Sequence, residues 1–187
     1  MVWWFWLIPL FIIVIVALIV VYYINRIIVL WNRIDNAWSQ IDVQLKKRAD
    51  LVPNLVETVK GYMRHEKKAI EMVTRSRENL LKAGTPQAKM KAGSELSTAL
   101  KTIFAIAENY PQLRASENFK LLQEQLEGIE NKIAYSRQFY NDSVLYFNNM
   151  ISTIPGVWFA PLLGKNKQRE YLEISERERK PVEVEFE

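Results

Sequence analysis

The stretch IIVLWNRIDNAWSQIDVQL, residues 27–45, repeats a large apolar side chain at every third or fourth position. Side chains with this spacing lie on one face of an α-helix, and a seven-residue repeat is typical of the narrow apolar seam of a coiled coil. The seam residues are Ile27, Trp31, Ile34, Trp38, Ile41 and Leu45. The repeat then meets Arg48 and resumes with the residues Val52, Leu55, Val59, Tyr62, Ile70, Val73 and Leu80. The pattern therefore predicts one long helix over residues 26–83.

Pro53 lies inside this predicted helix. Proline has no amide N–H, and it disfavours a helical backbone at the preceding residue, Val52. Because the apolar repeat keeps its register across Pro53, we expect a kink in a single helix. The alternative is a break, in which Asp50 caps a new helix that has Pro53 in its first turn.

The residues before the seam have the features of a membrane anchor. Residues 1–24 carry no charged side chain, and a run of this length can cross the hydrocarbon core of a bilayer. No basic side chain precedes the run and no small-residue cleavage site follows it, which argues against a signal peptide. Aromatic side chains, which prefer the membrane–water interface, lie at both ends of the run. They are Trp3, Trp4, Trp6, Tyr22 and Tyr23. Residues 1–25 are therefore predicted to be an uncleaved transmembrane anchor.

The orientation of this anchor follows from its flanking charge. Arg26 and Arg33 come directly after the apolar run, and Lys46–Arg48 add three more cations. Basic residues concentrate on the cytoplasmic side of membrane spans. We therefore expect the N-terminus outside the cell membrane and residues 26–187 in the cytoplasm.

Two further helices are expected after the first. Gly-Thr-Pro at 84–86 ends one helix and begins another, since glycine favours a helix end and proline favours a first helical position. Apolar spacing then predicts helices over 86–109 and 117–151. The expected fold is all-α: a transmembrane helix leading into an antiparallel bundle of three long helices over 26–151 with coiled-coil-like packing. The bundle has four helices if the first breaks at Pro53.

The last part of the chain changes character twice. Residues 152–164 contain two prolines and two glycines, which predict a loop, yet their large side chains are apolar. This loop either folds over the end of the bundle or exposes an apolar patch to a membrane or a partner. Residues 165–187 form a charged tail that we expect to be flexible, and a docking peptide is one function for such a tail. Its alternating residues, which are typical of a strand added to a partner's sheet, are Val182, Val184 and Phe186.

The sequence lacks the residues that several classes of function require. The chain has no cysteine and a single histidine, His65, so neither a thiolate site nor a multi-histidine metal site is expected. His65-Glu66 does not continue into the zinc-protease motif, because Ala69 stands where the second histidine belongs. The net charge of +4 is small and dispersed, which argues against nucleic acid as a partner. We expect no catalytic residue, no cofactor and no metal ligand, and hence no enzyme.

Polar and aromatic residues on the seam are the informative ones. Arg48 interrupts the apolar repeat, and a seam arginine needs a partner, which is expected to be a carboxylate on a facing helix or a group on another protomer. Trp31 and Trp38, one heptad apart, are either core residues or contacts between subunits. The candidate interface residues are Trp31, Trp38, Arg48, Val157, Trp158, Phe159, Leu162 and Leu163.

The sequence also resembles that of the LemA family over nearly its whole length. The runs that carry the resemblance are DNAWSQID at 35–42, VQLKKR at 43–48, DLVPNLVETVKGY at 50–62, ENYP at 108–111, SENF at 116–119 and FYND at 139–142, together with PVEVEF near the C-terminus. The resemblance implies a bacterial single-pass membrane protein with its N-terminus outside and a cytoplasmic helical bundle. It implies no enzymatic activity. Some relatives are implicated in magnetosome membranes, and others are encoded near membrane zinc proteases.

Two functions remain open at this point. The first is a membrane-anchored scaffold that assembles into a homo-oligomer at the cytoplasmic face of the bacterial inner membrane, where tethering raises the effective concentration of the copies. The second is an adaptor that presents its bundle or tail to a membrane protease or signalling partner. The bilayer is the expected partner in both cases.

Overall fold

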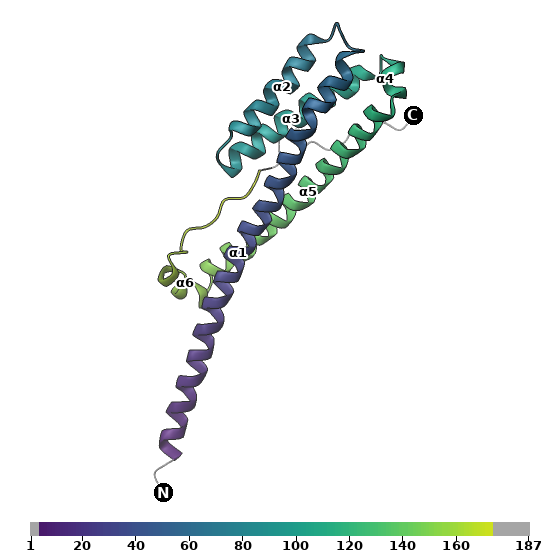
Figure 1. Cartoon of the computed structure of the whole chain (residues 1–187). Coiled ribbons are helices and arrows are strands. Elements are labelled where there is room, and N and C mark those ends of the chain that lie inside the picture. Colours follow the sequence, from purple (N-terminus) through teal and green to yellow (C-terminus); the bar gives the residue numbers. More distant parts are fainter. Residues whose placement is uncertain (1–3, 174–187) are drawn as a thin grey trace, which may run out of the picture. The chain divides into compact units, whose positions relative to one another are not determined.

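A computed structural model describes residues 4–173, and every regular element in this part of the chain is a helix (Figure 1). The predicted all-α class is confirmed. The elements are α1 (Trp4–Lys60), α2 (Lys67–Lys82), α3 (Pro86–Ala107), α4 (Pro111–Ala115), α5 (Glu117–Ser152), α6 (Gly156–Phe159) and the short 3₁₀ helix η1 (Pro161–Leu163). The predicted strand pattern at Val182, Val184 and Phe186 lies outside the described residues.

The described chain forms two compact units. Unit 1 comprises residues 4–37 and 139–171, and unit 2 comprises residues 38–138 with 172–173. The helices α1 and α5 each contribute to both units, whereas α2, α3 and α4 belong to unit 2, and α6 and η1 belong to unit 1.

The prediction of a single helix over 26–83 was wrong, because α1 ends at Lys60 and α2 begins at Lys67. The break is also not at Pro53, through which α1 continues. Proline leaves the carbonyl of the residue four positions earlier without its helical donor. In this helix the carbonyl belongs to Ala49, and Nε of Arg77 on α2 donates a hydrogen bond to it at 2.8 Å. A side chain from a neighbouring helix thus replaces the missing N–H.

The actual break, residues 61–66, coincides with a change in which side chain is buried. The seam predicted Tyr62 as an inward residue, but Tyr62 is exposed and Met63 is fully buried. Backbone hydrogen bonds from Met63 N to Val59 O (2.8 Å) and from Glu66 N to Met63 O (3.1 Å) close the turn. Four long helices, α1, α2, α3 and α5, therefore stand in the described chain where three were expected.

The later helix boundaries follow local signals. The hydroxyl of Thr85 accepts a hydrogen bond from Ala88 N at 3.2 Å, and Pro86 takes the first position of α3. Pro111 begins the short α4, which the sequence analysis did not predict. Within α3, a Cβ atom on Gly93 would lie 2.6 Å from Cδ2 of Leu45, so α1 and α3 approach closely here because the residue is a glycine.

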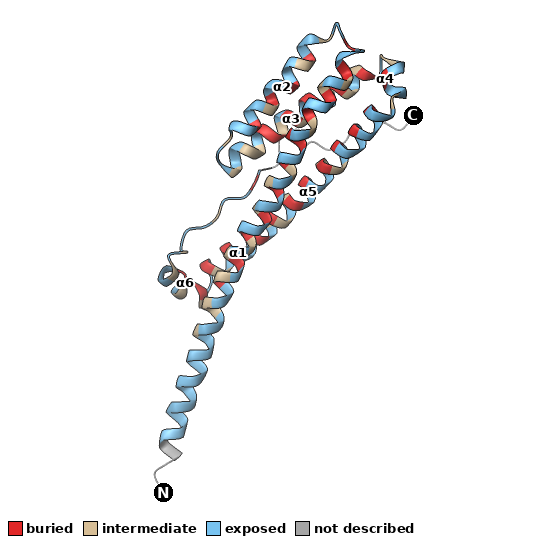
Figure 2. Ribbon diagram, viewed as in Figure 1, coloured by how far each residue is buried: buried red, intermediate tan, exposed pale blue. Residues whose placement is uncertain are grey.

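The surroundings of α1 change along its length (Figure 2). From Trp6 to Tyr22 its large apolar side chains are exposed, and it is the one helix among the described residues with the length and composition to cross a membrane. From residue 27 onward one side chain per turn is buried. The buried α1 residues include Ile27, Leu30, Ile34, Ala37, Ile41, Leu45, Val52, Leu55 and Val59. Trp31 and Trp38 of the predicted seam are only half-buried.

Candidate functional site

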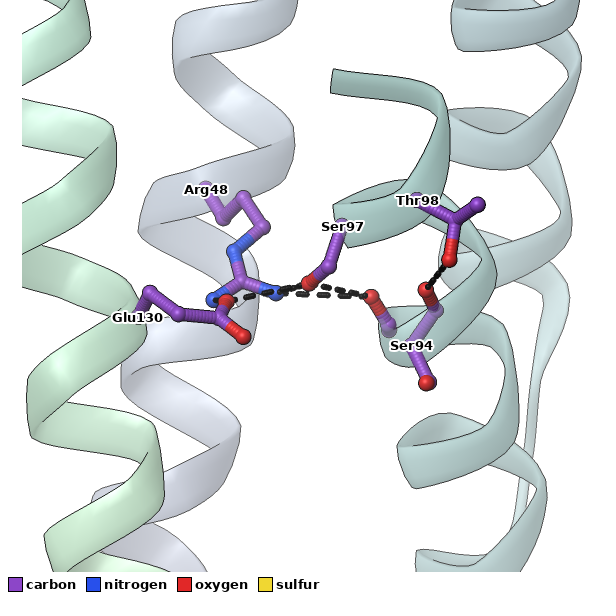
Figure 3. A network of polar contacts seen from close by, with 6 residues as sticks. Arg48, Ser94, Ser97, Thr98 and Glu130 are labelled. Atoms are coloured by element: carbon purple, nitrogen blue, oxygen red, sulfur yellow. Dashed lines mark hydrogen bonds and ion pairs between the residues drawn. The ribbon is translucent and has the colours of Figure 1, made fainter. Parts of the chain in front are cut away.

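The centre of unit 2 holds a polar cluster around Arg48, which we call the Arg48 cluster (Arg48, Gly93, Ser97 and Glu130; Figure 3). Arg48 of α1 donates from Nη1 to the Gly93 carbonyl at 3.3 Å and to the Ser97 hydroxyl, both on α3. Its Nη2 forms an ion pair with Glu130 of α5. Ser97 Oγ lies 3.0 Å from the same carboxylate. One guanidinium therefore joins three helices.

Burial explains the electrostatics of this cluster. The Arg48 side chain is almost inaccessible to solvent, and desolvation lowers its pKa below the usual arginine value, while the carboxylate of Glu130 opposes that shift. A buried arginine remains a cation and requires partners for its donors. The predicted carboxylate on a facing helix is confirmed as Glu130. The Arg48 partners in this structure lie on α3 and α5 of the same chain.

In unit 1, Trp31 lies among cationic and aromatic side chains that we call the Trp31 clamp (Trp31, Asp35, Phe147, Lys165 and Arg169). The indole packs edge-on against Phe147, with ring centroids 5.4 Å apart. Lys165 Nζ and Arg169 Cζ lie 3.7 and 4.0 Å from the centroid of the Trp31 ring, and Arg169 forms an ion pair with Asp35. Trp31 thus makes its contacts with segments of its own chain.

The backbone beside this clamp is held by a buried amide side chain. Nδ2 of Asn148 donates to the Arg169 carbonyl, and the Arg169 N–H donates to Oδ1 of Asn148, each at 2.9 Å. Tyr140 Oη also lies 3.4 Å from the Glu170 carbonyl. The tail was expected to be flexible from residue 165, and within it Lys165, Arg169 and Glu170 make these contacts with α1 and α5.

The apolar loop predicted at 152–164 contains α6 and η1, and its large side chains differ in exposure. Val157, Trp158 and Leu162 are exposed, whereas Phe159 and Leu163 are half-buried. The Phe159 ring stacks on Tyr23 of α1 with ring centroids 6.0 Å apart.

A groove of about 630 Å³ lies between α1 and α5 in unit 2. Val43 and Gln44 line it from α1, and Lys132 and Tyr135 line it from α5. Tyr135 is 74% exposed, and Oε1 of Gln44 is buried without a hydrogen-bond partner in the described structure. Trp38 directly precedes two other lining residues, Ser39 and Gln40.

The predicted interface residues are therefore spread over both units. Arg48 is in the core of unit 2 and Trp31 is in the clamp of unit 1, while Trp158 and Leu162 present free surface. The sequence analysis missed Asn148, although a signal was present. Asn148 lies four residues after the buried Val144 and next to the buried Phe147, so it is a polar residue within an apolar stripe.

Comparisons with known proteins give a family and one relative. The model of the LemA family matches residues 37–186. The magnetosome protein MamQ of Magnetospirillum gryphiswaldense is 28% identical over 81 residues, which is 43% of this chain and 30% of that protein. The match thus spans less than a third of the relative's own length. The family match includes the Arg48 cluster and the groove, and it begins after the exposed apolar part of α1.

Proposed function

The chain belongs to the LemA family, and from this premise we propose that it is a non-enzymatic scaffold that assembles into a homo-oligomer on the cytoplasmic face of a membrane. In this proposal the apolar part of α1 is the membrane anchor, with the N-terminus outside and residues 26–187 inside. The helices of unit 2 pack as an antiparallel bundle that supplies the contacts between copies.

The observation that carries this proposal is the continuity of α1 from Trp4 to Lys60. The exposed apolar span and the α1 residues that line the groove, such as Val43 and Gln44, belong to the same uninterrupted helix. Anchors in one bilayer must all point the same way, so copies meet in a restricted set of orientations, and a closed assembly is cyclic about the membrane normal. Tethering also raises their effective concentration, which allows weak contacts to assemble.

The groove between α1 and α5 is the contact surface that we propose, and its occupant is a second copy of this chain. Val43 and Tyr135 are large side chains that are exposed at the groove, and the exposure of their apolar surface to water is unfavourable. A second copy is the occupant because tethering holds neighbouring copies at high concentration beside this surface. Trp38, on the same helix beside the groove, is the predicted interface residue that fits this surface.

The mass of the full-length protein in mild detergent, measured by light scattering with the detergent subtracted, tests this function. We expect a uniform assembly of many chains. Tyr135→Glu places a charge in the groove and should reduce the mass severalfold. Leu121→Glu is the matched control, since Leu121 is also an exposed apolar residue of α5 but does not line the groove. A monomeric wild-type protein would overturn the scaffold.

The adaptor function is the alternative, and the hydrogen bonds that hold the backbone at Arg169 favour it. Because this point of the chain is held, the charged residues after it would be presented to a partner from a defined place. A monomer that captures a membrane protein, and loses it when the chain is shortened after residue 173, would support this alternative. The shortening must start there, because removal from residue 165 would also remove the Trp31 clamp.

A further inference from the structure

Residues 152–164, which we call the foot, bury small residues and expose large apolar ones, which is the reverse of the usual arrangement. The small residues Gly156 and Ala160 are buried, whereas Trp158 and Leu162 are 62% and 75% exposed. The inward position cannot hold a larger residue, because a Cβ atom on Gly156 would lie 2.0 Å from the Met150 carbonyl oxygen. A segment that faces water would have its large apolar side chains on the inside. The foot is therefore built to present them.

The foot lies against α1 at the end of its apolar run. Phe159 stacks on Tyr23, with ring planes 29° apart. On α1 the exposed apolar side chains continue to Tyr22, and the first buried residue is Ile27. The contact at Tyr23 thus falls where the surroundings of α1 change from those of a membrane span to those of a packed protein.

The charges around the foot follow the same boundary. Residues 152–164 contain no charged side chain, and neither does α1 before Arg26. Arg26 is exposed, and Lys165 follows the foot directly. An uncharged apolar segment with tryptophan, flanked by cations, is typical of an element at the boundary between headgroups and acyl chains.

We propose that the foot inserts into the bilayer leaflet beside the point where α1 emerges, so that Trp158 and Leu162 contact lipid. This makes a second membrane contact in addition to the span. It rests on the anchoring of α1 that the proposed function includes. A bilayer is the occupant because the foot is continuous with the apolar surface of α1 through the stacked Tyr23 and Phe159 rings. In an anchored copy, the bilayer covers that surface.

The absence of native cysteine makes a direct test possible. Leu162→Cys in the full-length protein is labelled with an environment-sensitive fluorophore and placed, at one copy per particle, in nanodiscs of phosphatidylcholine and phosphatidylglycerol. Nitroxides on the lipid acyl chains should quench this label severalfold more strongly than aqueous iodide does. Its emission should also shift to the blue relative to that of a label in water.

Two matched labels complete the experiment. Leu121 is an exposed leucine of α5, and the helix places it about 46 Å from Ser152 along the helix axis. A label on Leu121→Cys should be quenched by iodide alone. Leu10→Cys, within the apolar run, should be quenched by the lipid nitroxides. If Leu10 responds to lipid and Leu162 responds to iodide, or to neither quencher, the foot does not insert although α1 is anchored. If Leu10 does not respond to lipid, anchoring fails and this inference fails with it.

Discussion

Arg48 in unit 2 and Arg169 in unit 1 make the same kind of interaction in different surroundings. Each forms an ion pair with a carboxylate, Glu130 for Arg48 and Asp35 for Arg169. The side chains of Arg48 and Glu130 are 3% and 36% exposed, whereas those of Arg169 and Asp35 are 32% and 55% exposed, so the main difference lies in the burial of the guanidinium. The two regions therefore offer a direct comparison of how burial changes the contribution of an ion pair to stability.

The difference appears in what each arginine leaves behind when it is removed. Without Arg48, the Gly93 carbonyl and the Glu130 carboxylate lose a donor at the meeting point of three helices. Without Arg169, Asp35 is returned to water and Trp31 keeps its contact with Phe147. Removing one partner of a buried pair costs far more than removing one partner of an exposed pair. Unit 2 therefore depends on its arginine more strongly than unit 1 does.

The largest effect is expected for Arg48→Met, which keeps an apolar side chain of similar length and removes the charge. The free energy of opening of unit 2 should fall by about 3 kcal/mol, because the Gly93 carbonyl, the Ser97 hydroxyl and the partly exposed Glu130 carboxylate all lose their shared donor. Hydrogen exchange of peptides from α1, α3 and α5 in the full-length protein measures this opening for unit 2 separately from unit 1.

A double variant sharpens this prediction. Adding Glu130→Gln to Arg48→Met removes the unpaired charge, and should recover a large part of the lost stability, since the two residues act as a pair. If Glu130→Gln brings no recovery, the cluster stabilises unit 2 by packing and not by charge. The contrast with Arg169 would then have another cause.

Arg77 provides an intermediate case, because it is half-buried and donates to a carbonyl instead of a carboxylate. Arg77→Ala leaves the buried Ala49 carbonyl without a donor and should lower stability by about 2 kcal/mol. In a Pro53→Ala background, the new amide N–H of residue 53 bonds to that carbonyl. Arg77→Ala should then have a clearly smaller effect, as measured by hydrogen exchange in α1. Equal losses in both backgrounds would show that Arg77 has no compensating role at Pro53.

The same two regions show which features of the fold and of the Arg48 cluster could be predicted from the sequence. The apolar repeat predicted that residues 27–45 form a helix with a buried face, and it predicted that Arg48 has a carboxylate partner. It did not identify Glu130, because the choice among acidic residues depends on which helices pack together. The family resemblance was confirmed, since it rested on long runs of residues.

The errors have local physical causes. At Pro53 the preferred expectation of a continuous helix is met, and a donor from α2 satisfies the carbonyl that proline leaves free, which is a contact that single-helix rules do not include. α1 ends at Lys60, three residues before the fully buried Met63, whereas the apolar repeat predicted Tyr62 as the inward residue. The charged composition after residue 164 predicted flexibility, yet two hydrogen bonds from Asn148 hold Arg169 in place.

The smallest effect is expected for Arg169→Ala. The variant loses an ion pair that is largely exposed and a cation–π contact with Trp31, which together contribute about 1 kcal/mol. Hydrogen exchange should report this loss in residues 165–171 and leave α3 unchanged. Asn148→Ala tests the backbone contacts of the same segment, and the adjacent Asn149→Ala is its control, because Asn149 is exposed.

Salt separates the two regions without altering their packing. At 1 M salt the Debye length falls to about 3 Å, so the exposed pair of Asp35 and Arg169 is screened, whereas the pair of Arg48 and Glu130, whose guanidinium is buried, is screened much less. The difference between wild type and Arg169→Ala should shrink in high salt, whereas the difference between wild type and Arg48→Met should persist. If both differences shrink equally, the interior of unit 2 is accessible to ions and burial does not distinguish the two arginines. If neither shrinks, Arg169 acts mainly through its stacking on Trp31, which salt affects much less than an ion pair in water.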